Sequence, residues 1–154
     1  MDVTQLPFNR LIRLEAAPSQ SGFLVSLPDG LQYTNHLGTV HASALLAVAE
    51  AGSGAFLVQH LGNHEGFVPV VRRLEAKFRK PASGRVSARA SVLPEEIARW
   101  SSELATRGRV LAAVPMEVVD VDGVVVLTGV VEWFIARSGE QAYPSAASAQ
   151  GGII

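Results

Sequence analysis

The sequence has no cysteine and little charge. Its 154 residues include 13 Lys and Arg against 14 Asp and Glu, which gives a formal net charge of -1. The missing cysteine excludes disulfide scaffolds, cysteine zinc sites and thiol nucleophiles, and it fits a reducing compartment. The near-zero charge argues against a nucleic-acid binder, because such a protein needs a basic face. Charged residues are 18% and hydrophobic residues 48% of the chain. We therefore expect a folded chain that covers part of its surface with a partner, such as a second copy.

Neither a secretory signal nor a membrane span is expected. Residues 1–7 lack the basic and apolar regions of a signal peptide, so a cytoplasmic location is predicted. Residues 42–61 are long enough to cross a bilayer. However, they are mostly Ala, Gly and Ser, and a carboxylate such as Glu50 costs roughly 2.5–3.5 kcal/mol inside a bilayer. A buried core helix, without membrane contact, is the better interpretation.

The hydrophobic pattern predicts one long helix among several strands. Strands are predicted over 11–16, 22–27, 68–80, 85–93, 109–121 and 124–137, a buried helix over 41–61, and a short amphipathic helix from Pro94 that ends before Gly108. Asp122-Gly123 indicates a hairpin between the last two strands, and Pro115 indicates an edge or a bulge. This order is typical of an α+β domain whose antiparallel sheet wraps around the helix. We expect one domain over 1–137 and a flexible tail over 138–154.

Two local patterns refine these elements. Val70, Leu74, Ala76 and Phe78 alternate with charged residues and should share the apolar face of their strand, on which Arg72 is an exception. In the long helix, Gly52 and Gly54 each cost about 1 kcal/mol relative to Ala. Close approach to a sheet or to a ligand would offset that cost.

Glu50 is the most informative residue for function. It is the only Asp, Glu, Lys or Arg between His41 and Leu61. Because a lone buried carboxylate is expensive, it needs a partner, a proton or a chemical role. The alternative is a helix edge that exposes Glu50 to solvent.

The loop before the long helix carries further candidate residues. Asn35, His36, Thr39 and His41 lie within seven residues and end at the predicted helix N-terminus. Free backbone N–H groups near Ala42 can hold a developing oxyanion there. Helix capping and turn formation are the alternative roles for the same side chains.

Other kinds of site find little support in the sequence. The histidines His60 and His64 are four residues apart, but Gly62 and Asn63 end the helix between them. There is no HExxH motif and no third ligand nearby, so no metal is expected. The Asp120–Gly123 segment is interpreted as a turn and not as a calcium loop. No Walker loop, GxGxxG or GxSxG motif is present.

The segment Asn35-His36-Leu37-Gly38-Thr39-Val40-His41, followed nine residues later by Glu50, resembles a motif of the hotdog-fold acyl-CoA thioesterases of the phenylacetate-pathway type. Those enzymes carry N-x-x-G-x-x-H-G-G and then an acidic residue on the central helix. The segment Phe78-Arg79-Lys80-Pro81-Ala82 also resembles the family's strand end with its Pro-Ala turn. The resemblance covers roughly residues 8–137.

This resemblance implies a fold, an activity and a set of site residues. The fold would be a hotdog, a curved antiparallel sheet around one helix, in which two subunits pair and share each active site. Glu50 would activate water or attack the thioester carbonyl, and Asn35 would position the water or the carbonyl. The Ala42 N–H, aided by His41, would hold the carbonyl oxygen, with Gly38 as a further substrate contact. The substrate would be an acyl-CoA, with no cofactor beyond its coenzyme A, and the assembly a dimer or a dimer of dimers.

The chain also departs from that pattern. Ala42 and Ser43 stand where the family has two glycines, Glu50 replaces the commoner Asp, and the strand after the helix offers no Ser or Thr. Arg72 or Arg73 could hold a coenzyme A phosphate, pair with Glu50 across the interface, or lie on a plain surface. A binding module for acyl thioesters or fatty acids therefore stays open.

A hotdog dehydratase or hydratase is the third alternative. Those enzymes pair a histidine with a glutamate fourteen residues later, which is the spacing from His36 to Glu50. Their loop contains His-Phe-Pro-Gly, whereas this chain has no proline in the loop. This reading is disfavoured for that reason.

Overall fold

A computed structural model describes residues 1–62 and 66–138 of the chain. The predicted tail beyond Ser138, and His64, lie outside the described residues. The elements in chain order are η1 (Val3–Gln5), α1 (Pro7–Leu11), β1 (Glu15–Ala16), β2 (Val25–Leu27), η2 (Leu31–Tyr33), α2 (Ala42–Leu61), β3 (Phe67–Phe78), β4 (Val86–Ala90), α3 (Pro94–Arg107), β5 (Arg109–Val119) and β6 (Val125–Arg137).

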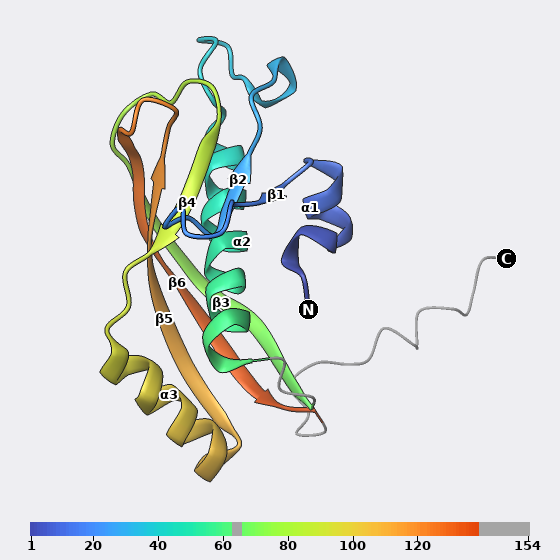
Figure 1. The fold of residues 1–154 in the computed structure, drawn as a ribbon, viewed down its shortest axis with the longest axis vertical. Coiled ribbons are helices and arrows are strands. Elements are labelled where there is room, and N and C mark those ends of the chain that lie inside the picture. Colours follow the sequence, from blue (N-terminus) through green and yellow to red (C-terminus); the bar gives the residue numbers. More distant parts are fainter. Residues whose placement is uncertain (63–65, 139–154) are drawn as a thin grey trace, which may run out of the picture.

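One curved antiparallel sheet holds all six of these strands, in the order β1-β2-β4-β5-β6-β3. Helix α2 lies along its inner face, and α3 lies beside β5 (Figure 1). The α+β prediction of a sheet around one long helix is confirmed. In this sheet β3 is an edge strand, so one side of its backbone has no strand partner within the described residues.

Helix α2 forms the core because its apolar residues surround it on nearly every side. His41 caps its start and Gly62, with a φ of 74°, lies just past its end. Val48, Ala49 and Ser53 are buried against the sheet. By length and composition α2 is the one described helix that could cross a membrane. Its place inside the sheet agrees with the prediction of a core helix.

Two local signals in the second half of the chain are also confirmed. Gly108 follows α3 with a φ of 69°, the left-handed conformation that commonly ends a helix. Gly123, with a φ of 78°, forms the turn between β5 and β6, where the Asp120 carboxylate accepts the N–H groups of Asp122 and Val124 at 3.0 and 2.9 Å. Pro115 lies on the interior strand β5, one residue beyond the last that pairs with β4, and its carbonyl accepts the Ser91 N–H at 3.0 Å. The predicted edge or bulge is therefore reduced to the end of the β4 ladder.

The strand predicted over 11–16 is mostly wrong. Leu11 ends the short helix α1, and β1 contains only Glu15 and Ala16. Pro7 stands at the start of that helix, where its fixed φ favours helix formation. Arg13 then adopts a φ of 54° that turns the chain toward the sheet.

A β-bulge explains the exceptional position of Arg72. Val71 pairs with Trp133 and Arg73 with Glu132, so Arg72 is an extra residue without a partner in the ladder. Because a bulge reverses the alternation, Val71 and not Val70 shares the inner face with Leu74. The predicted face of Val70 is therefore wrong.

Candidate functional site

At the N-terminus of α2, the His41 cap leaves one backbone N–H group without a partner among the described residues. The His41 Nδ1 accepts the Ser43 N–H at 3.0 Å, and the His41 backbone N–H donates to the Tyr33 carbonyl at 2.7 Å. The Ala42 N–H, the first of the helix, makes no hydrogen bond among the described residues. Ala42 is exposed, so this N–H is available to an oxygen atom of a ligand.

The Asn35 side chain organises the loop that leads to this helix. Its Oδ1 accepts the N–H groups of Leu37 at 2.9 Å and Thr39 at 3.2 Å, and its Nδ2 donates to the Thr39 hydroxyl at 3.0 Å. Gly38, with a φ of 74°, completes the turn and lies on a separate cavity of about 60 Å³. His36 is exposed in the same loop. In this structure Asn35 therefore shapes the loop; its predicted contact with water or a carbonyl stays a prediction.

Glu50 lies in the middle of α2, about 160° around the helix from Val48. Its side chain is half-buried, which differs from the solvent-exposed alternative. Burial raises the pKa of its carboxyl group above the ordinary value of 4.5. No ion pair or side-chain hydrogen bond to this carboxyl group occurs among the described residues. Glu50 is thus an unpaired carboxylate with an increased affinity for a proton.

Arg72 and Arg73 lie on β3 at the bulge. Arg73 forms an ion pair with Glu75 at 2.9 Å, in which both side chains are more than 60% exposed. Its ladder partner Glu132 places it on the outer face of the sheet, away from α2. Arg72 is exposed. Within one chain neither arginine is brought together with Asn35, His41 or Ala42, and their predicted roles remain predictions.

A groove joins the start of α2 to the end of β3. It has a volume of about 350 Å³ and is lined on one side by Asn35, Thr39 and Ala42. The other side is formed by residues 78–82, including Arg79 and Lys80. The sequence singled out this segment only for its Pro-Ala turn and did not identify the two cations as site residues.

An apolar cavity of about 140 Å³ lies at the opposite end of α2. Leu57, Val58 and Leu61 of the helix line it, together with Phe67 of β3 and Ile135 of β6. Glu50 therefore stands between a groove that contains cations and a cavity that is mainly apolar.

The residues described here form no cluster of three His, Asp or Glu side chains that could hold a metal ion. His60 instead stacks on Phe56, with ring centroids 4.2 Å apart.

The sequence profile of a protein family, described as a domain of unknown function (DUF4442), matches residues 10–135. No curated protein matches the sequence significantly.

Solved structures show the same fold. A protein of unknown function from Pseudomonas aeruginosa, described as a probable thioesterase, is 24% identical with a TM-score of 0.73, and the match covers 88% of this chain and 91% of that one. A Bacillus halodurans protein solved with CoA is 21% identical with a TM-score of 0.64, over 83% and 74% of the two chains. A Haemophilus influenzae thioesterase is 14% identical with a TM-score of 0.66, over 92% and 90%. The chain has the hotdog fold that the resemblance implied.

Proposed function

This chain belongs to the DUF4442 family, and from that membership and its hotdog fold we propose that it hydrolyses acyl-CoA thioesters to a free acid and coenzyme A. The observation that carries the proposal is that one helix carries both an unpartnered, half-buried carboxylate, Glu50, and a free N-terminal N–H at Ala42. Thioester hydrolysis needs one base or nucleophile and one oxyanion site, and these two groups have the required chemistry.

The proposed reaction uses Glu50 as the general base. Its carboxylate takes a proton from water while the water oxygen attacks the thioester carbonyl carbon. The Ala42 N–H donates to the carbonyl oxygen as negative charge develops on it. The carbon–sulfur bond then breaks, the sulfur takes the proton that Glu50 received from water, and the thiol and the carboxylic acid are released. Direct attack by Glu50 on the carbonyl is the alternative route for the same residue.

We further propose that a second copy of the chain completes the site. Ala42 and Glu50 are eight residues apart on α2, which separates them by about 12 Å along the helix and about 80° around it. A thioester held at Ala42 is therefore better placed for the Glu50 of a partner than for the Glu50 of the same chain. The open edge of β3 offers a surface for such pairing.

Two substitutions test the chemistry. Glu50→Gln should lower kcat by about 10²- to 10⁴-fold, because it removes the base but keeps the shape. Ala42→Pro should lower kcat by about 10²- to 10³-fold, because it removes the N–H donor. Proline is tolerated at the first position of a helix, and the preceding His41 already has the extended conformation that proline requires. Both effects are measured as the rate at which free thiol is released from a panel of acyl-CoA substrates.

Mixing the two variants tests the shared site. If Glu50 and Ala42 act across two chains, unfolding and refolding the inactive variants together should restore about a quarter of the sites, since half of random dimers are mixed and carry one intact site. If both groups act within one chain, no activity returns. Tight acyl-CoA binding by the wild type without any turnover would support the binding-module alternative instead.

A further inference from the structure

Arg79 and Lys80 lie at the start of the loop after β3, on the groove that also contains the Ala42 end of α2. We propose that these two cations bind the phosphate groups of the substrate's coenzyme A. The inference rests on the proposed function and deepens it by placing the nucleotide end of the substrate. The acyl end would then extend from Ala42 away from the two cations.

Arg79 is held in position by neutral groups. Its Nε donates to the Thr128 hydroxyl at 2.9 Å, and its backbone N–H donates to the Val126 carbonyl at 2.8 Å. Neither contact neutralises the guanidinium charge, and its two terminal nitrogens have no partner in the described part of the chain. Thr128 lies on the outer face of β6, like Glu132, so this bond holds the guanidinium at the outer edge of the strand end. Its fork stays free to bind phosphate oxygens in pairs.

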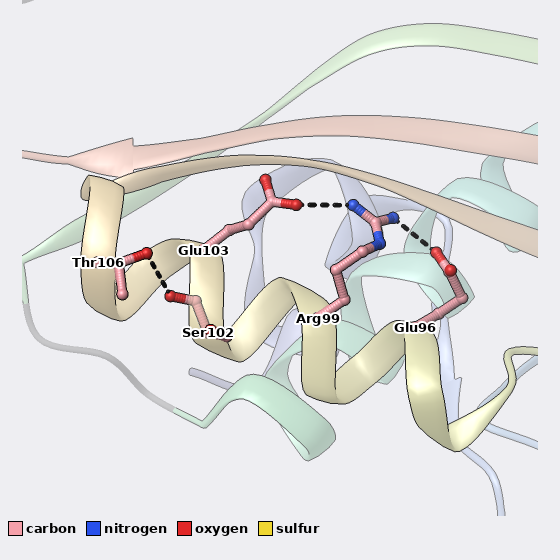
Figure 2. A network of polar contacts seen from close by, with 5 residues as sticks. All are labelled: Glu96, Arg99, Ser102, Glu103 and Thr106. Carbon is pink, nitrogen blue, oxygen red and sulfur yellow. Dashed lines mark hydrogen bonds and ion pairs between the residues drawn. The ribbon is translucent and has the colours of Figure 1, made fainter.

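The charge of the groove is not balanced by any acid. Its lining contains Arg79 and Lys80 but no Asp or Glu. Four other arginines, Arg73, Arg85, Arg89 and Arg99, form ion pairs, and Arg99 on α3 binds both Glu96 at 2.6 Å and Glu103 at 2.9 Å (Figure 2). An anionic ligand would supply at the groove the negative charge that carboxylates supply at these ion pairs.

The rest of the groove fits the uncharged arm of coenzyme A. Leu37 and Phe78, on its two sides, are 70% and 48% exposed. These apolar surfaces would be covered by the pantetheine arm as it runs from a thioester at Ala42 to the phosphates at Arg79 and Lys80. The Ala42 side and the Arg79–Lys80 side of the groove would thus hold the two polar ends of that arm.

A second pair of cations provides a matched control. Arg107 and Arg109 line a different groove, of about 560 Å³, beside α3 and β5. That groove contains Glu103 and no residue of the loop before α2. Removal of either pair changes the net charge by the same amount, so a general electrostatic effect would be equal in both variants.

The experiment compares free coenzyme A and pantetheine, which lacks the phosphates, by titration calorimetry. We expect Arg79→Ala/Lys80→Ala to weaken coenzyme A binding by about 10- to 100-fold, as for the loss of charge-assisted hydrogen bonds. Pantetheine binding should not change, and Arg107→Ala/Arg109→Ala should bind both ligands like the wild type. The effect should also diminish at high salt. Equal losses in the two double variants, or equal losses for the two ligands, would overturn the inference.

Kinetics separate this inference from the proposed function. With acyl-CoA the Arg79→Ala/Lys80→Ala variant should raise KM and preserve kcat, because the phosphates lie far from the reacting carbonyl. With an N-acetylcysteamine thioester, which has no phosphate, both constants should be unchanged. Coenzyme A binding that depends on Arg79 and Lys80 in a protein without thioesterase activity would retain the inference and reject the function. If the wild type hydrolyses acyl-CoA and the Arg79→Ala/Lys80→Ala variant has unaltered coenzyme A binding and KM, the function is retained and the inference is rejected.

Discussion

The two faces of helix α2 are alike in composition and different in packing. On the face toward the sheet, Val48 and Ser53 have 0% exposure, and Gly52 has no space for a side chain. On another side of the helix, Glu50 and Gly54 are half-buried, and a methyl group at Gly54 would make ordinary contacts with Trp133 of β6 and with Val3. The difference indicates that the Gly52 side packs tightly on the sheet, whereas the Gly54 side has room for a methyl group.

The largest expected effect on stability comes from Gly52→Ala. The new Cβ would lie 2.7 Å from the Ala88 Cβ and 2.9 Å from the Met116 Cε. Because the Ala88 Cβ is attached directly to β4, the helix must move away from the sheet. We expect a loss of about 2–3 kcal/mol in the free energy of unfolding, which exceeds the helix propensity gained. Urea denaturation measures it.

Gly54→Ala is the matched control for that prediction. Its Cβ would lie 3.6 Å from Trp133 and Val3, which is ordinary contact. The alanine should therefore stabilise the protein by up to about 1 kcal/mol through helix propensity. If both alanine variants lost the same stability, the distinction between the two faces would be wrong.

A smaller effect is expected at the hydrogen bond that joins the sheet to α2. The Trp133 Nε1 donates to the Ser53 Oγ at 2.9 Å, and that hydroxyl donates to the Glu50 carbonyl at 2.6 Å. Ser53→Ala leaves a buried indole N–H without an acceptor, so the free energy of unfolding should fall by about 1–2 kcal/mol.

A double-mutant cycle isolates this hydrogen bond from packing. Trp133→Phe removes the donor, and its own cost includes the lost ring volume. The double variant Ser53→Ala/Trp133→Phe should therefore be more stable than the sum of the single losses predicts. Additive losses in denaturant unfolding would mean that Ser53 and Trp133 do not act as a pair.

The sequence predicts the arrangement of the fold well because most elements carry their own signals. The apolar run 42–61, the Pro94 start and Gly108 end of α3, and the Asp122-Gly123 turn each depend on nearby residues. The face of Val70 could not be predicted, because an extra residue at Arg72 is defined only by its pairing with β6. The register depends on how two strands pair, so it cannot be inferred from the alternation of residues in one strand.

The candidate site also contains residues that local sequence signals identify and residues that only the fold identifies. Glu50 is visible in the sequence because a charge inside an apolar helix is unusual on local grounds. Arg79 and Lys80 are not, because two exposed cations after a strand are ordinary until the fold places them on a groove with Ala42. The free Ala42 N–H was predictable as a helix start, but the groove required the loop and the strand end together.

The smallest predicted effect concerns the pH dependence of stability. Burial raises the pKa of Glu50 in the folded chain above the unfolded value of 4.5, so the folded state binds its proton more tightly. The contribution of Glu50 to stability is then fully present below pH 4.5 and is lost as the pH rises through the folded pKa. Glu50→Gln does not titrate, so its Tm minus that of the wild type should increase as the pH rises above 4.5 and become constant above the folded pKa.

The Tm difference reports on Glu50 alone, because the other carboxylates contribute equally to the pH dependence of both proteins. Hydrogen bonds lower the pKa values of Asp2 and Glu96, which gives the opposite slope, but both residues are present in both proteins. The effect should be modest because Glu50 is only half-buried and water screens its charge. Hydrolysis requires the ionised Glu50, so activity should rise over the same pH interval in which this stability is lost. A Tm difference that is constant with pH, or that decreases, would place Glu50 on a fully solvated face and remove the contrast between the two sides of α2.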